Sequence, residues 1–193
     1  FGWVMEAKRR GAKVYHIDPR FTRTSAVADR HVAIRPGSDV AFLGGVVRYI
    51  LENELDFREY VLAYTNAATI VSEDFRDTED LDGLFSGFDP ETGSYDQTSW
   101  QYQGQETRGG AGDTVTQRDT AAGLRHESHG APIASDVARD ETLTHPRCVY
   151  QILKRHFSRY TPEMVERVCG ISREDFEEVA RAWVANSGRD RTT

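Results

Sequence analysis

The chain has 193 residues, of which 38% are hydrophobic and 28% are charged, and its formal net charge is −7. This acidic balance argues against a protein that binds nucleic acid through a general attraction to phosphates. It contains no run of about 20 apolar residues, so we expect no segment that spans a membrane directly. The length accommodates one domain and parts of a second.

The first predicted element is a helix over residues 1–10, because apolar residues share one side of it and basic residues occupy its last turn. Gly11 follows, as at many helix C-termini. A strand is predicted next, over Lys13–Ile17. A short and largely apolar run entered from a glycine is typical of a buried strand in a parallel sheet.

Polar groups that suit a nucleotide follow directly after this strand. Asp18 lies at the carboxyl end, where Pro19 stops the strand because it lacks an N–H. Ligands of open α/β sheets bind outside the carboxyl ends of strands, and a carboxylate there accepts hydrogen bonds from a ribose hydroxyl or a guanine edge. Arg20 adds a forked donor for phosphate, and Thr22 adds a hydroxyl. Asp-Pro-Arg is also a common strand-ending turn, so an ordinary surface turn stays open.

A second candidate segment, Gly37-Ser38-Asp39, opens a helix that we predict over Val40–Asn53. Ser38 or Asp39 can cap this helix and leave the other side chain free. Backbone N–H groups at such a helix start favour anions and polar ligand edges. A capped helix that binds nothing is the alternative interpretation.

Apolar residues at helical spacing support this helix, namely Phe42, Leu43, Val46, Val47, Ile50 and Leu51. Gly44 and Gly45 lie inside it, where each glycine costs roughly 1 kcal/mol relative to alanine. We therefore expect another backbone to approach the helix closely at these two positions.

Residues 72–144 form a polar stretch in which we expect no regular secondary structure. A loop of this length within a compact domain indicates a functional insertion or a disordered segment. The first part carries enough aromatic residues to dock on another surface. The second part, about 103–140, contains Arg108-Gly-Gly-Ala-Gly112, which we interpret as a flexible linker because no strand precedes it as in a phosphate-binding loop.

Helical patterns return over residues 145–193. A helix is predicted over His145–Arg159, and a second begins after Thr161, with Pro162 in its first position and Gly170 beyond its end. Ser172-Arg-Glu-Asp175 resembles a capping box before a third helix, whose apolar positions include Phe176, Val179, Ala180 and Trp183.

The cysteines and histidines do not form a metal-binding pattern. Cys148 and Cys169 are twenty-one positions apart in helical segments, and this spacing suits no metal site. We expect both thiols to be small buried groups, and a disulfide between them stays open. The six histidines are scattered, with no pair at a catalytic or zinc spacing.

Several stretches of the sequence resemble a known family. The string His16–Asp29, followed by Arg35–Gly45, resembles the major (alpha) subunit of formate dehydrogenases. The further stretches that agree are Tyr49–Asn53, Tyr64–Val71, Asp82–Phe88, Trp100–Tyr102 and His145–Gly170. These subunits belong to the molybdopterin oxidoreductases of the dimethyl sulfoxide reductase type, which hold molybdenum or tungsten between two molybdopterin guanine dinucleotides.

The resemblance implies that Asp18, Arg20 and the turn Gly37–Asp39 contact the guanosine end of one such dinucleotide, with Asp39 on the guanine edge. It also implies that this chain is an internal fragment. The ligands of the family's 4Fe-4S cluster, its selenocysteine or cysteine metal ligand and its catalytic histidine and arginine would then precede Phe1. No catalytic or metal-binding residue is therefore expected within these 193 residues, and the fragment alone is expected to be inactive.

For the complete protein, the resemblance implies oxidation of formate to carbon dioxide, with electrons passed through iron–sulfur centres to quinone or NAD. The implied partners are a membrane cytochrome subunit and an iron–sulfur (beta) subunit. In respiratory members of the family the insertion is ordered by the surrounding subunit, so its conformation here would depend on partners. The resemblance favours a periplasmic or cell-envelope location reached by a twin-arginine signal, and related soluble enzymes leave a cytoplasmic one open.

The expected fold is α/β: part of a Rossmann-like parallel-sheet lobe with flanking helices and a long irregular insertion. We divide the chain into a nucleotide-binding lobe (1–71), the insertion (72–144) and a helical continuation of the lobe (145–193). One alternative is an NAD(P)-binding Rossmann domain of another oxidoreductase, against which the missing Gly-x-Gly-x-x-Gly argues. The other is a noncatalytic remnant that binds a partner, favoured by the long polar insertion.

Overall fold

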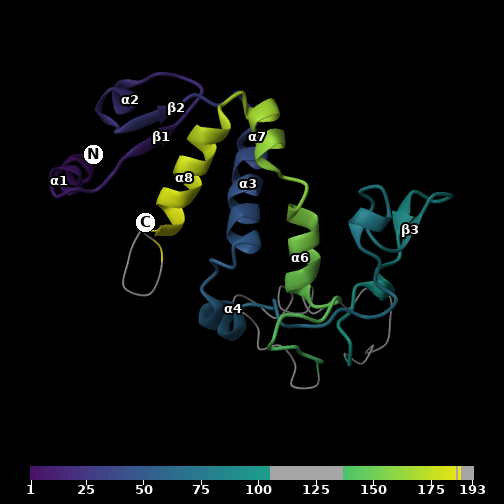
Figure 1. Cartoon of the computed structure of the whole chain (residues 1–193). Helices are drawn as coiled ribbons and strands as arrows, with labels where there is room; N and C mark the ends of the chain where they lie inside the picture. Colours follow the sequence, from purple (N-terminus) through teal and green to yellow (C-terminus); the bar gives the residue numbers. More distant parts are fainter. Residues whose placement is uncertain (105–136, 186, 188–193) are drawn as a thin grey trace, which may run out of the picture. The chain divides into compact units, whose positions relative to one another are not determined.

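The computed structural model describes residues 1–104, 137–185 and 187, and Figure 1 shows its helices and strands. The chain divides into two compact units. The first unit combines Phe1–Asp56 with Phe157–Thr193, and the second is Phe57–His156. Elements of the first unit are α1 (Gly2–Arg9), β1 (Tyr15–Ile17), α2 (Arg23–Val27), β2 (Arg30–Val32), α3 (Asp39–Glu52), α7 (Pro162–Cys169) and α8 (Arg173–Ala185). Mixed helix and strand with a parallel pair confirms the expected α/β class at this coarse level.

The sheet of the first unit consists of β1 and β2, which run parallel with His16 opposite His31 and Ile17 opposite Val32. The short helix α2 makes the crossover between them. β1 is two residues shorter than predicted from the apolar run. β2 was not predicted at all, because Arg30-His31-Val32 contains only one apolar residue.

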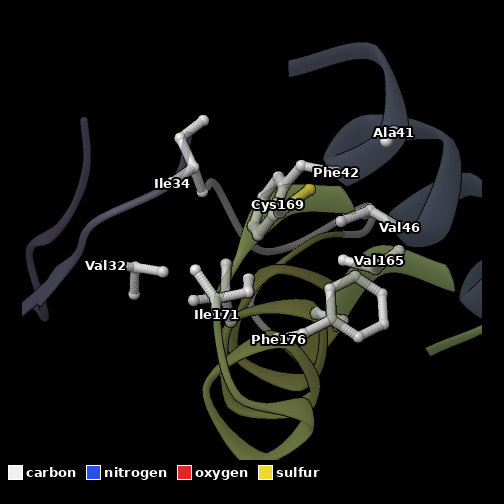
Figure 2. Packing of buried hydrophobic residues seen from close by; sticks show 11 residues of the cluster. Val32, Ile34, Ala41, Phe42, Val46, Val165, Cys169, Ile171 and Phe176 are labelled. Carbon is white, nitrogen blue, oxygen red and sulfur yellow. The ribbon is translucent and has the colours of Figure 1, made fainter. Parts of the chain in front are cut away.

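The core of this unit lies where α3 packs against α7 and α8 (Figure 2). Phe42 of α3 meets Phe176 of α8 edge to face, with ring centroids 5.8 Å apart. Val32 and Ile34 extend the same cluster from the sheet side. The other buried members are Ala41, Val46, Val165, Cys169, Ile171, Val179 and Ala180.

Close packing explains the two glycines inside α3. A Cβ at Gly45 would lie 2.6 Å from Cγ2 of Val165, and one at Gly44 would lie 2.6 Å from Cδ1 of Tyr160. Both distances are shorter than carbon atoms tolerate, so neither position has room for a side chain. The expectation that a backbone approaches here was wrong, because the nearest atoms at both positions belong to side chains.

The second unit contains α4 (Arg58–Tyr64), the 3₁₀ turns η1 (Thr78–Asp80) and η2 (Gln97–Ser99), the hairpin β3 (Phe88–Asp89) with β4 (Ser94–Tyr95), and α6 (Val149–Phe157) apart from its last residue. The expectation of no regular structure in 72–144 was therefore wrong for its first part. Short polar side chains form these pieces locally, because Asp77 accepts a hydrogen bond from the Glu79 N–H and Asp96 accepts one from the Thr98 N–H. The glycine run at 108–112 lies outside the described residues.

The helix predicted over His145–Arg159 begins only at Val149, because the residues before it pair with a distant segment. The Val71 N–H donates to the Arg147 carbonyl, and the Val149 N–H donates to the Thr69 carbonyl, both at 3.0 Å. Cys148 forms a bridge with Ile70. These contacts lie within one unit, which contains both residues 57–71 and residues 145–156. The division predicted from the sequence puts these two segments in different domains, and it stays a prediction.

The described residues form neither a membrane-spanning helix nor a metal-binding cluster. None of the described helices is long and apolar enough to cross a membrane. Within residues 1–104 and 137–185, no three His, Cys, Asp or Glu side chains gather as a group that could hold a metal ion.

Candidate functional site

Asp18 ends β1 in a turn that its own carboxylate closes. Its N–H donates to the Val32 carbonyl at 3.1 Å, which continues the ladder between the strands by one residue. Its Oδ1 accepts a hydrogen bond from the Arg20 N–H at 2.7 Å. Among the contacts of the described residues, Oδ2 accepts no hydrogen bond, so this oxygen remains available at the carboxyl end of the strand.

Thr22 serves as the N-cap of α2 and is thereby held in place. Its hydroxyl oxygen accepts from the Thr24 N–H at 3.2 Å, and its N–H donates to Ser25 Oγ at 2.7 Å. The Arg20 guanidinium is exposed, and no hydrogen bond or ion pair of the described residues engages it. The first candidate segment therefore presents the Oδ2 oxygen of Asp18 and, two residues later, the guanidinium of Arg20. Neither group is used in a hydrogen bond among the described residues.

His31, which was not among the site residues predicted from the sequence, supports this turn. His31 Nε2 lies 3.0 Å from the Asp18 carbonyl oxygen. A carbonyl only accepts, so Nε2 carries the proton. His16 Nδ1 lies 2.9 Å from Ser25 Oγ, which links β1 to the cap of α2. The only sequence signal for these contacts is that a histidine stands in each strand.

The second candidate segment forms the entry to α3. Gly37 adopts φ +79°, in the left-handed region that favours glycine, and open space surrounds the position of its absent Cβ. Ser38 is buried, and its Oγ donates to the Arg35 carbonyl at 2.6 Å. Asp39 is exposed in the first turn of α3, and no hydrogen bond or ion pair of the described residues involves its carboxylate.

The capping expectation was wrong in detail. Ser38 occupies the N-cap position, but neither it nor Asp39 makes a side-chain capping bond to the helix, because the Ser38 hydroxyl turns back to Arg35. At the positive end of α3, the Asp39 carboxylate thus has no hydrogen-bond or ion-pair partner among the described residues.

The first candidate segment directly follows β1, and the Gly37–Asp39 turn comes after β2 and four intervening residues, so the parallel pair directs the chain toward both segments from the same end of the strands. Within the described contacts, no hydrogen bond joins either Asp18, Arg20 or Thr22 to the Gly37–Asp39 turn. Two cavities of about 230 and 250 Å³ lie in the second unit, near Arg155 and Leu153 respectively, and contain none of these six residues.

Comparison with known proteins gives a consistent result over the whole chain. The "Formate dehydrogenase, nitrate-inducible, major subunit" of Escherichia coli is 44% identical over 194 residues, which cover 100% of this chain and 16% of that protein. The "Formate dehydrogenase major subunit" of Haemophilus influenzae is 43% identical over 96% of this chain and 16% of its own length. A sulfite dehydrogenase of Allochromatium vinosum is 30% identical over 92% of the chain.

No protein-family model matches the chain. A solved structure, "Acetylene Hydratase from Pelobacter acetylenicus", covers 95% of the chain at 15% identity with a TM-score of 0.47, a likeness too low to carry an argument.

These relatives define the class of the protein, which is the molybdopterin oxidoreductases. Within that class, the chain belongs to the family of formate dehydrogenase major subunits. It spans 16% of the length of the relatives that it matches over its whole length.

Proposed function

We propose that this chain helps bind one molybdopterin guanine dinucleotide in a formate dehydrogenase catalytic subunit that oxidises formate to carbon dioxide. The residues assigned to the guanosine end are Asp18, Arg20, Thr22, Gly37, Ser38 and Asp39. The observation that carries the proposal is the Asp39 carboxylate at the start of α3, which has no partner among the described residues and lies next to a glycine turn, on the chain that leaves the strand paired with that of Asp18.

The donors and acceptors present fit a guanosine phosphate. Guanine presents an N–H and an NH₂ side by side, and a carboxylate such as that of Asp39 accepts from both at once. The free Oδ2 of Asp18 suits a ribose hydroxyl, and the Arg20 guanidinium suits a phosphate. The open space at Gly37 allows a ligand to lie against the backbone.

The contribution of this chain is binding and orientation. The cofactor supplies the redox chemistry when bound. Asp39 selects the base, Asp18 and Arg20 fix the sugar and phosphate, and Thr22 and Ser38 shape the two turns through their backbone contacts.

The wider proposal concerns the complete protein. We place β1 and β2 in a Rossmann-like sheet, with a bis-dinucleotide molybdenum or tungsten centre and a 4Fe-4S cluster whose ligands are not assigned to residues of this chain. A cytochrome and an iron–sulfur subunit are the proposed partners, and the name of one formate dehydrogenase relative, from Nitratidesulfovibrio vulgaris, includes cytochrome c-553. A periplasmic or cell-envelope location remains a prediction.

The test uses the full-length protein that contains this chain, with Asp39→Ala and the matched control Asp74→Ala. Asp74 is also an exposed carboxylate, and it lies in the second unit with no side-chain hydrogen bond among the described residues. We expect formate-dependent dye reduction by wild type and the control. In Asp39→Ala we expect loss of this activity together with loss of the GMP released from bound cofactor by acid hydrolysis.

Three results would contradict the proposal. Full GMP release from Asp39→Ala would remove the residue from the guanine site. A wild-type protein that binds NAD in competition with GDP, and contains no molybdopterin, would favour the NAD(P)-binding alternative. A folded wild type with no nucleotide affinity would favour a noncatalytic, partner-binding role.

A further inference from the structure

The turn that presents Asp39 is tied to the end of a helix far away in sequence. Arg35 Nη1 donates to the carbonyls of Arg167 at 2.5 Å and Val168 at 3.3 Å, and the Arg35 N–H donates to the Cys169 carbonyl at 2.8 Å. These three carbonyls belong to the last turn of α7, where a helix leaves its carbonyls without intrahelical partners. One arginine therefore satisfies the C-terminus of α7 with both its side chain and its backbone.

The same residue holds the other side of the turn. The Arg35 carbonyl accepts from Ser38 Oγ at 2.6 Å and from the Ser38 N–H at 3.2 Å. Cys169 Sγ lies 3.5 Å from the Ser38 carbonyl, and burial raises the pKa of this thiol, which keeps it a donor. Figure 2 shows Cys169 among core side chains beside Phe42 of α3. The turn is thus held between α7 and the start of α3.

Gly170 completes this arrangement. It ends α7 in the left-handed conformation, with φ +71°, and a Cβ there would lie 2.9 Å from Arg35 Nε. A larger residue would therefore meet the guanidinium that docks on the helix end. The positive charge of Arg35 also suits the negative end of the α7 dipole.

We propose that Arg35 is a positioning residue, which fixes the Gly37–Asp39 turn on the C-terminus of α7 so that the Asp39 carboxylate meets the guanine edge. This inference rests on the proposed function of Asp39. The guanidinium holds the turn by binding α7 and need not touch the nucleotide, because its Nη1 donates to the Arg167 and Val168 carbonyls. Guanine selectivity should then depend on residues that contact no ligand.

The experiment measures binding of guanosine, GMP and adenosine by calorimetry to the full-length protein prepared without its cofactor. The variants are Arg35→Gln and Gly170→Ala, with Asp39→Ala as the direct-contact reference. Arg173→Gln is the matched control for arginine, since Arg173 bonds to Glu163 and Glu177 and to no residue of the turn. Gly93→Ala is the control for glycine, because it shares a positive φ and has nothing near its Cβ position.

We expect Arg35→Gln to weaken guanosine and GMP by the same factor, about tenfold, and to lower the ratio of guanosine to adenosine affinity. Gly170→Ala should act in the same direction while the guanidinium is retained. A merely destabilising substitution would leave that ratio unchanged, as we expect for both controls.

The outcomes separate the two proposals. If Asp39→Ala weakens guanosine but Arg35→Gln and Gly170→Ala match wild type, the positioning role is overturned and the proposed function stands. If Arg35→Gln weakens GMP and not guanosine, Arg35 contacts phosphate directly, and the positioning role is again overturned. If wild type does not prefer guanosine, or Asp39→Ala has no effect, both proposals fall.

Discussion

His16 and His31 face each other across the parallel strands, with their rings stacked at a centroid distance of 5.5 Å. The His31 ring is also contacted edge-on by Phe21, with centroids 5.3 Å apart. One nitrogen of each histidine is used, His31 Nε2 on the Asp18 carbonyl and His16 Nδ1 on Ser25. The pair therefore joins the end of β1 to both of its neighbours, β2 and α2.

The first prediction separates stacking from hydrogen bonding at His31. His31→Phe keeps a ring on His16 but removes the donor to Asp18, and it should lower the free energy of unfolding by about 1 kcal/mol. His31→Gln keeps a donor and removes the ring. Urea denaturation of both variants measures the two contributions, and a His31→Phe protein as stable as wild type would show that the Asp18 carbonyl finds water instead.

Helices whose ends are encoded locally were predictable from the sequence. Thr161 caps α7 by accepting from the Met164 N–H, Pro162 stands in its first position, and Gly170 ends it, as expected. α3 was predicted over Val40–Asn53, within one residue of the structure at each end, because its apolar spacing is regular.

Features that depend on distant partners were not predictable. The side chain of Arg35 finds its acceptors 132 and 133 residues away, at the end of α7, and nothing in the local sequence signals these contacts. Cys148 likewise pairs with Ile70 and delays the start of α6. For the candidate site, it was therefore predictable that polar residues follow β1 and that a glycine turn opens α3. The contacts that hold these residues in place were not predictable.

The second prediction concerns the packing of α3. Gly45→Ala improves helix propensity by roughly 1 kcal/mol, but the added methyl meets Val165 at 2.6 Å and the Phe176 ring at 2.9 Å. Overpacking of a close-packed core costs about 1–3 kcal/mol. We therefore expect net destabilisation, measured as a lower urea midpoint.

The matched comparison for this variant is Gly2→Ala. Gly2 lies in α1 with nothing within 4 Å of its Cβ position, so the same chemical change should be neutral or slightly stabilising there. Equal effects at the two positions would show that propensity, and not contact with Val165, decides the outcome.

The third prediction concerns the thiols. Cys148 and Cys169 are both buried and free, so the disulfide that the sequence left open is not formed in the structure. Burial raises the pKa of the Cys169 thiol, and reaction with disulfide reagents requires the thiolate. Ellman's reagent should label both cysteines rapidly in denaturant and slowly in the native protein. Rapid native labelling would contradict the burial of whichever thiol reacts.

The last prediction is a pH dependence that originates at Asp140. The Thr142 hydroxyl, followed by the backbone N–H groups of His145, Thr142 and Thr144, lowers the pKa of this carboxyl from 3.8 to about 2. These bonds enclose Leu143, which is buried and adopts φ +57°, a backbone conformation that needs support in a residue other than glycine.

A carboxyl whose pKa is lowered by folding stabilises the folded state above its unfolded pKa, and this contribution is lost as pH falls through the folded value. Wild type should therefore exceed Asp140→Asn in free energy of unfolding at pH 7, and the difference should shrink as the pH falls from about 4 to about 2. Urea titrations of wild type and Asp140→Asn at several pH values measure this difference. A difference between wild type and Asp140→Asn that stays constant over this range would assign the effect of Asp140 to shape rather than charge.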